Sequence, residues 1–290
     1  MALLDELADT TRSVATAVSE AIVAVGRGSG VVVDAGLVVT CAHNLHGDTA
    51  ELVTAGGHRL EATVLGADLD GDLAVLRAEG LDSAPLERST TDVEAGDVVF
   101  AAANPYGQGI RVTSGQVTAT DRSFRGPRGQ RNTGALEHTA PLLRGSSGGA
   151  VVDSSGALLA INTHRLEGGF YVAVPVDEAW WRRMESLRTG DYRPRQRLGV
   201  AVLSPRTGRR IRAAAGLPER DGLLVRSVRE DGPAARAGIE AGDLLVASGD
   251  SPLATVDDLH DVLAAAGDTL TLTVVRGVDE RTVEVHFEGD

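Results

Sequence analysis

Short runs of aliphatic and β-branched residues, separated by turn residues, follow one another from about residue 21 to residue 175. Runs such as "SGVVVD", "LAVLR" and "FYVAVPV" have the length and composition of strands, and Gly, Asp and Asn are frequent between them. Short strands with turns about every eight to twelve residues are typical of a barrel or a sandwich. This part of the chain is therefore predicted to be an all-β domain.

Helical patterns stand on both sides of this β-rich part. Apolar residues spaced for one helical face predict a helix over residues 3–18, and "VDEAWWRRMESLRTG" predicts another that ends at Gly190. After "DYRPRQ", strands alternate with two helical patterns, "PAARAG" and "VDDLHDVLAAAG". We therefore divide the chain into an N-terminal extension (1–20), a β domain (21–190), a linker (191–196) and a small α+β domain (197–290).

Composition narrows the function classes. The chain has 290 residues, of which 42% are hydrophobic and 3% aromatic, so a sizeable core must be built mainly from aliphatic side chains. The net charge of −13 argues against general nucleic-acid binding. The single cysteine excludes an internal disulfide, and no apolar run reaches the ~18–20 residues of a membrane span. The N-terminus lacks the basic and apolar regions of a secretory signal, so we expect a cytoplasmic protein with no membrane span.

Three polar residues beside predicted strands form a constellation for acyl transfer. His43 follows the run "LVVT", Asp72 directly precedes "LAVL", and Ser147 lies in the glycine-rich "GSSGG". Such a reaction needs a nucleophile, a base that takes its proton and an acid that orients the base. The order His, Asp, Ser along the chain is that of the peptidase triad on double β-barrels.

Each of these residues has an alternative interpretation. "GSSGG" has the composition of an ordinary turn, and Asp68 and Asp70 compete with Asp72 for the role of the acid. Cys41 is interpreted as a small core residue, and His46 and His58 as surface residues without a partner pattern. No spacing resembles a metal site, so neither a metal nor a cofactor is expected.

Five segments together resemble the bacterial HtrA/DegP group of trypsin-like serine proteases. "VVTCAHNL", "DLDGDLAVLR" and "GSSGGAVV" resemble the three catalytic segments, while "ANPYGQGIRVTSGQVTA" and "GFYVAVP" resemble two further stretches of that family in the same order. The resemblance extends from about residue 21 to 290. It implies a mostly β fold, with a chymotrypsin-like double β-barrel followed by a small α+β PDZ domain, and the activity of a serine-type endopeptidase.

The resemblance also assigns the positions of the glycine-rich loop. It makes Ser147 the nucleophile and puts Ser146 in the variable position before it. The backbone N–H groups of Gly145 and Ser147 would form the oxyanion hole, whose donors are each worth about 10²–10³-fold in rate. Gly148 and Gly149 would let the next strand start close beneath the site.

The segment before this loop departs from the family pattern. In "HTAPLLRG" the family's acid, asparagine and proline are replaced by Thr139, Leu143 and Arg144. We therefore expect a less ordered oxyanion loop at rest. Leu142, Leu143 and the small residues near 161–163 suggest a small or medium aliphatic residue at the substrate's P1 position.

The C-terminal domain resembles the PDZ domains attached to these proteases. "RLGVAV" matches the carboxylate-binding loop, so Leu198, Gly199 and Val200 are the expected peptide-binding residues. Thr255, with Asp258 three residues later, predicts a near capping box at the start of the groove helix. A PDZ domain that only packs on the protease and binds no peptide is the alternative.

Residues 182–212 contain ten arginines and only two acidic residues. A solvated linker is the first interpretation, and attraction of acidic peptide tails or contact with the acidic protease domain is the second.

The expected function is cleavage of unfolded or specific proteins, in protein quality control or regulated proteolysis, with protein or peptide substrates and with C-terminal peptides at the PDZ groove. The alternative is a catalytically weak protease fold that acts as a PDZ peptide-binding scaffold. A homo-oligomer is possible. Residues 1–30 contain no Phe, Tyr or Trp, whereas the family's trimers use aromatic residues there, so we expect weaker or different self-association with the N-terminal helix as a substitute.

Overall fold

The computed structural model describes residues 2–126, 131–193 and 196–287. The chain divides into two compact units, Met1–Arg193 and Pro194–Asp290, which are described separately below. None of the helices among the described residues has the length and apolar character needed to cross a membrane.

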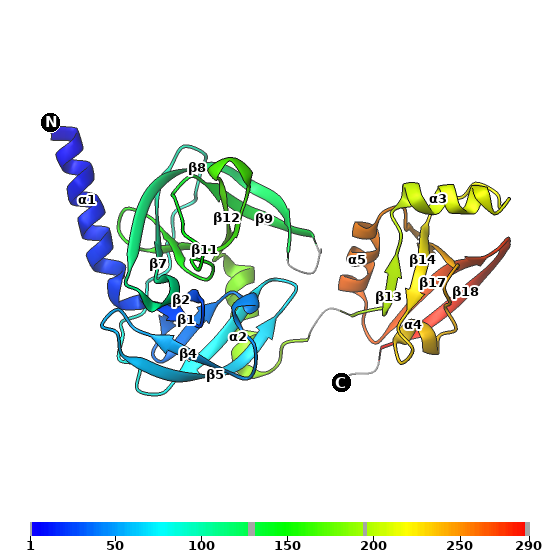
Figure 1. The fold of residues 1–290 in the computed structure, drawn as a ribbon, viewed down its shortest axis with the longest axis horizontal. Helices are drawn as coiled ribbons and strands as arrows, with labels where there is room; N and C mark the ends of the chain where they lie inside the picture. Colours follow the sequence, from blue (N-terminus) through cyan, green and yellow to red (C-terminus); the bar gives the residue numbers. More distant parts are fainter. Residues whose placement is uncertain (1, 127–130, 194–195, 288–290) are drawn as a thin grey trace. The chain divides into compact units, whose positions relative to one another are not determined.

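The first unit contains two closed six-stranded barrels (Figure 1). The first has the strand order β1-β2-β3-β6-β5-β4 and the second β10-β11-β12-β9-β8-β7. The strands of the first barrel are β1 (Ile22–Val25), β2 (Gly28–Asp34), β3 (Leu37–Thr40), β4 (Thr49–Val53), β5 (Arg59–Asp68) and β6 (Leu73–Ala78). Those of the second are β7 (Val98–Ala103), β8 (Arg111–Arg125), β9 (Arg131–His138), β10 (Ala150–Val152), β11 (Leu158–Arg165) and β12 (Tyr171–Pro175). The predicted double β-barrel is confirmed.

Aliphatic side chains fill the barrels, as the composition requires. The strands β1, β3 and β10 are buried along their whole length, and apart from Thr40 at the end of β3 they consist of apolar residues instead of an alternating pattern. Burial of each Val or Leu contributes about 1.5–3 kcal/mol. Phe100 is the large aromatic side chain that is fully buried in this core.

Two helices flank the barrels. α1 (Ala2–Val18) packs the C-terminal half of its apolar face on β7 and β8 through Val14 and Val18, while its N-terminal half runs away from the barrels (Figure 1). α2 (Glu178–Thr189) lies on β5 and β6 and buries Trp180, Met184 and Leu187. Asp177 caps its N-terminus, and Gly190, in the left-handed conformation, ends it.

The second unit is a small α+β domain with a sheet of order β13-β14-β15-β17-β18, in which β16 pairs with β15. Its strands are β13 (Val200–Val202), β14 (Leu223–Val228), β15 (Leu244–Ser248), β16 (Ser251–Pro252), β17 (Thr269–Arg276) and β18 (Asp279–His286). Its helices are α3 (Pro205–Ala214), α4 (Pro233–Arg236) and α5 (Val256–Ala265). α5 begins with a complete capping box between Thr255 and Asp258.

Helix α3 departs from the sequence prediction, which treated this arginine-rich stretch as part of the basic segment around the linker. Ser204 caps the helix and Pro205 occupies its first turn. Gly208 is buried in its middle, and a Cβ atom there would lie 3.1 Å from the Cβ of Leu224. The glycine therefore allows α3 to approach β14 closely, although it weakens the helix pattern in the sequence.

Candidate active site

His43 and Asp72 are carried by turns at one end of the first barrel. The chain leaves β3 at Thr40 and forms a short 3-10 turn, Ala42–Asn44, which presents His43 with its side chain 32% exposed. Asp72 stands between β5 and β6 with φ 54°, in the left-handed region that aspartate tolerates better than most residues. Asp68 accepts hydrogen bonds from the amides of Asp70 (3.0 Å) and Gly71 (2.8 Å). Asp68 therefore stabilises the turn that positions Asp72.

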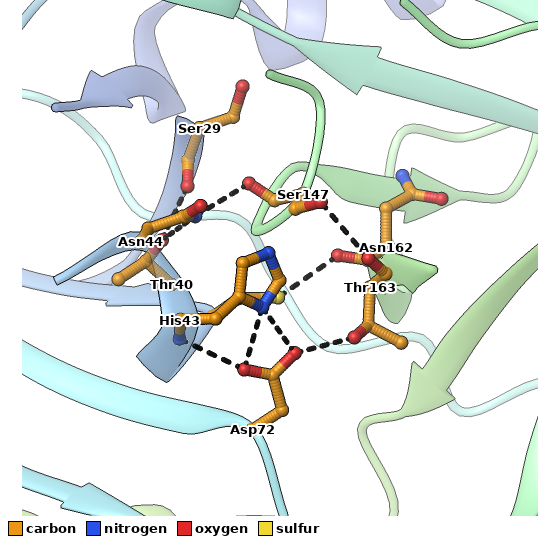
Figure 2. A network of polar contacts seen from close by, with 9 residues as sticks. Ser29, Thr40, His43, Asn44, Asp72, Ser147, Asn162 and Thr163 are labelled. Carbon is orange, nitrogen blue, oxygen red and sulfur yellow. Dashed lines mark hydrogen bonds and ion pairs between the residues drawn. The ribbon is translucent and has the colours of Figure 1, made fainter. Parts of the chain in front are cut away.

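The Asp72 carboxylate holds the His43 ring from below (Figure 2). His43 Nδ1 lies 2.9 and 2.8 Å from the two carboxylate oxygens, and the His43 amide donates to Oδ1 at 3.1 Å. Thr163 Oγ1 donates to Asp72 Oδ2 at 2.6 Å. Because a carboxylate only accepts, Nδ1 carries the proton and Nε2 is left as the basic nitrogen.

The same contacts set the acidity of Asp72. Burial opposes ionisation and would raise the pKa of Asp72, but the hydrogen bonds and charge of His43 and the hydroxyl of Thr163 outweigh this effect. The pKa of Asp72 is therefore lowered, so the carboxylate stays ionised beside the imidazole.

Glycines shape the loop that carries Ser147, between β9 and β10. Gly145 and Gly148 have φ +86° and +87°, where an L side chain is strained. A Cβ at Gly148 would lie 2.1 Å from the carbonyl oxygen of Ser29, and one at Gly149 would lie 2.5 Å from that of Ala102. These positions exclude any side chain because the loop packs directly on backbone of both barrels.

Ser147 is fixed through its backbone, while its hydroxyl is held by a single bond. Its carbonyl oxygen accepts from the Ser29 amide and from Asn44 Nδ2, both at 2.9 Å, and Oγ donates to the Thr163 carbonyl at 3.0 Å. Figure 2 draws the His43 ring between Asp72 and Ser147. Within the described part of the chain, the amides of Gly145 and Ser147 donate to no protein group.

This geometry and the sequence can be compared with known proteins. Residues 28–161 match the trypsin-like peptidase domain family, and residues 197–287 match the PDZ domain family. The serine endoprotease DegS of Escherichia coli strain K12 is 31% identical over 280 residues, which cover 90% of this chain and 76% of DegS. The chain belongs to the HtrA family of serine endoproteases.

Other HtrA-type relatives agree with this assignment. A probable periplasmic DegP-like serine endoprotease of Brucella suis is 35% identical over 269 residues, and the chain spans about half (50%) of its length. The solved serine endoprotease from Yersinia pestis superposes with a TM-score of 0.69 at 27% identity, covering 95% of this chain and 96% of that one. The HtrA-type protease AlgW with a decapeptide gives a TM-score of 0.71 at 25% identity and covers 95% and 97%.

Several residues of this HtrA-family site carry no signal that marks them in the sequence. Asn162 donates through Nδ2 to the Ala150 carbonyl (3.0 Å), and its own carbonyl accepts from the Gly148 amide (2.7 Å). His138 is fully buried, stacks on Tyr171 with ring centroids 5.7 Å apart, and lies with Nε2 2.9 Å from Asn162 Oδ1. These contacts connect β9, β11 and β12 with the nucleophile loop.

Cys41, His43 and Asp72 place one sulfur, one nitrogen and one oxygen within 4.8 Å of one another. The Cys41 thiol is buried and donates to the Asn162 carbonyl at 3.3 Å. Burial and the nearby Asp72 charge raise the pKa of this thiol, so the thiolate that a metal ion would need is disfavoured. His43 Nδ1 and the Asp72 carboxylate already form a hydrogen bond with each other. The three residues therefore suit a buried thiol beside a His–Asp pair better than a metal site.

Leu198 and Gly199 lie in the loop of the PDZ domain that leads into β13, which begins at Val200. Leu198 is buried and Gly199 has φ +78°. The Leu198 carbonyl accepts from the Ala234 amide (2.9 Å), and the Gly199 carbonyl from the Arg229 amide (2.8 Å). Among the described residues, the amides of Leu198 and Gly199 have no protein acceptor. The turn into β13 at Val200 thus directs its carbonyls inward and leaves two N–H donors.

Proposed function

We propose that this chain hydrolyses peptide bonds with Ser147 as nucleophile, His43 as base and Asp72 as the group that orients the base. The observation that supports it most directly is the hydrogen-bonded His43–Asp72 pair next to a loop with two amides that have no protein acceptor. Such donors stabilise the negative charge that develops on the attacked carbonyl oxygen.

In the proposed reaction the Ser147 side chain rotates from the Thr163 carbonyl towards His43 Nε2. Oγ then attacks the peptide carbonyl carbon while its proton passes to Nε2. The tetrahedral intermediate, held by the amides of Gly145 and Ser147, breaks its C–N bond, and the amine leaves with the proton from Nε2. Water, deprotonated by His43, hydrolyses the resulting ester and restores Ser147.

A fluorophosphonate probe tests this function directly. We expect stoichiometric labelling of the full chain at Ser147, loss of labelling in Ser147→Ala, and strong impairment in His43→Ala. An unlabelled wild-type chain that still binds C-terminal peptides would instead support the scaffold alternative. The acceptor-free amides of Gly145 and Ser147 favour the enzyme over that scaffold.

We further propose that the PDZ domain binds C-terminal peptides at Leu198, Gly199 and Val200 and thereby regulates cleavage of unfolded or specific proteins. The Leu198 and Gly199 amides provide donors for a terminal carboxylate. The proposal is supported if peptides activate the full chain but not residues 1–193. A role for the nearby arginines is supported if salt weakens activation by acidic peptides. Equal activity of both chains with every peptide would reduce the PDZ domain to a tether.

A further inference from the structure

A cavity of about 380 Å³ opens beside Ser147. One wall is the nucleophile loop, residues 142–147, and the other is the end of β11, residues 162–165, together with Tyr171 of β12. A carbonyl attacked by Ser147 must lie next to both walls. The side chain of the residue that carries this carbonyl, the P1 residue, therefore has this cavity as its nearest space.

Two arginines give this cavity an unusual charge for a chain of net charge −13. Arg144 and Arg165 line it, and no Asp or Glu is among its lining residues. The Arg165 guanidinium lies 5.8 Å from the centroid of the Tyr171 ring, and Tyr171 is itself held by a 3.2 Å hydrogen bond to the Leu142 carbonyl. This cation–π contact favours a position of the Arg165 charge beside the cavity.

Among the described side chains no carboxylate pairs with Arg144 or Arg165, whereas Arg122 pairs with Glu137 and Arg276 with Asp243 elsewhere in the chain. An apolar P1 side chain would displace water from the two guanidinium groups without replacing its hydrogen bonds. An acidic side chain would replace them with charge-assisted ones, for which the planar guanidinium is well suited.

The apolar side chains of the cavity do not form a closed aliphatic pocket. Leu143 is 57% exposed, so most of its surface faces solvent. The remaining wall includes Asn162, Thr163 and His164, all polar. The sequence-based expectation of an aliphatic P1 residue therefore rests mainly on Leu142, which is only half-buried.

We propose that this cavity selects substrates with Glu or Asp at P1, and that Arg165, assisted by Arg144, determines this specificity. The proposal rests on the serine peptidase function proposed above. Hydrogen bonds to charged groups predict a preference for Glu over the isosteric Gln of about 10- to 100-fold.

The test separates recognition from turnover. Amidated peptides that differ only in P1 (Glu, Gln, Val or Lys) are titrated against the full chain carrying Ser147→Ala, and the amide prevents capture of a terminal carboxylate by the PDZ loop. The same peptides serve as substrates of the wild-type chain. Arg165→Ala should reduce the Glu-to-Gln ratio to nearly one, Arg144→Ala should reduce it in part, and Arg165→Glu should favour Lys at P1. Arg77→Ala, at an exposed position on β6, is the matched control and should keep the ratio.

The outcomes are distinct. Tighter binding and faster cleavage of the Glu peptide, lost with Arg165, support the proposal. Equal or tighter binding of the Gln or Val peptide overturns it, whatever the catalytic rate. Selective binding of the Glu peptide without cleavage of any substrate would leave the specificity intact and contradict the proposed peptidase function.

Discussion

Ser29 of the first barrel donates a 2.9 Å hydrogen bond from Oγ to the carbonyl oxygen of Gly145 in the nucleophile loop of the second barrel. The same hydroxyl accepts from the Asn104 amide at 3.0 Å, and Ser29 is fully buried. The Ser29 side chain thus fixes the peptide group that begins with the Gly145 carbonyl. This group lies between the amides of Gly145 and Ser147, the two candidate oxyanion donors. We therefore expect Ser29 to act as a positioning residue, which would influence the oxyanion donors only through Gly145.

Ser29→Ala should therefore lower kcat much more than it changes KM. The substitution leaves a buried carbonyl and a buried amide without a partner, which costs about 1–3 kcal/mol, and a loop that loses order by that amount would slow turnover about 10- to 100-fold. Steady-state kinetics measure the split. Ser83→Ala, at a half-buried serine after β6, is the control, and an unchanged kcat in Ser29→Ala would contradict the positioning role.

The two adjacent serines should behave very differently. Ser147→Ala, His43→Ala and Asp72→Asn should each reduce cleavage of casein by about 10⁴-fold or more, because triad members act as a unit. Ser146→Ala should retain most activity, since Ser146 contacts the loop through its backbone: its amide donates to the Leu143 carbonyl at 3.3 Å. A dead Ser146→Ala variant would shift the nucleophile by one residue.

Gly148→Ala should destabilise the protein far more than the left-handed conformation alone requires. Gly80 has a similar φ of +75°, but a Cβ added there would meet no neighbouring atom within 4 Å, whereas at Gly148 the Ser29 oxygen would be 2.1 Å away. Gly80→Ala should cost about 1–2 kcal/mol of unfolding free energy from backbone strain. Gly148→Ala should add about 1–3 kcal/mol from overpacking, measured by denaturant unfolding, and equal losses would contradict the close approach.

Acidification should weaken the fold through His138. Burial lowers the pKa of His138 below its usual value of 6.5, although the hydrogen bond to Asn162 acts in the opposite direction. Protonation would place a proton on Nδ1, which is buried and has no hydrogen-bond partner among the described residues. As the pH falls, the imidazole of the unfolded chain, whose pKa is near 6.5, is therefore protonated before that of the folded chain. The stabilisation from the neutral imidazole is complete above pH 6.5 and is lost as the pH falls from 6.5 through the lower folded pKa.

His138→Gln tests this dependence because its amide can still donate to Asn162. Unfolding of the full chain is measured between pH 8 and 5, in a Ser147→Ala background that prevents self-cleavage. The variant should lose less stability than the parent over the acidic half of this range. Parallel curves would assign the acid sensitivity to other groups.

We propose that self-association uses the N-terminal half of α1, which contains Leu7. Leu7 is 46% exposed and lies beside a surface hollow that Ile110 and Val112 also line. Leu7→Asp should weaken any assembly seen by sedimentation at micromolar concentration without changing the monomer fold. A stable trimer that is unaffected by Leu7→Asp would contradict this role of α1.

The strands and the candidate triad could be predicted because their signals are local. Each strand run is a continuous segment, Asp72 directly precedes "LAVL", and the glycines directly flank the two serines of "GSSGG". Each of these signals can therefore be recognised from a few neighbouring residues. Ser29 and Gly145 are 116 residues apart, and the hydrogen bond between them has no local signature. Helix α3 escapes prediction for a different reason: Gly208 is unfavourable in a helix by about 1 kcal/mol, and the close approach to Leu224, 3.1 Å from a Cβ added at Gly208, has no local signature in the sequence.

Helix α2 covers the first barrel but is synthesised long after the strands of that barrel. The last strand of the first barrel ends at Ala78, but the helix that covers β5 and β6 ends only at Thr189. Gly66 has no room for a side chain because the Leu187 carbonyl would lie 2.6 Å from its Cβ, so the barrel surface is shaped for this late helix. At about 5–20 residues per second, the ribosome needs roughly 6–22 s to supply it. During that interval β5 and β6 lack the apolar cover that Trp180, Met184 and Leu187 give them in the folded chain, and apolar surface exposed in this way favours aggregation.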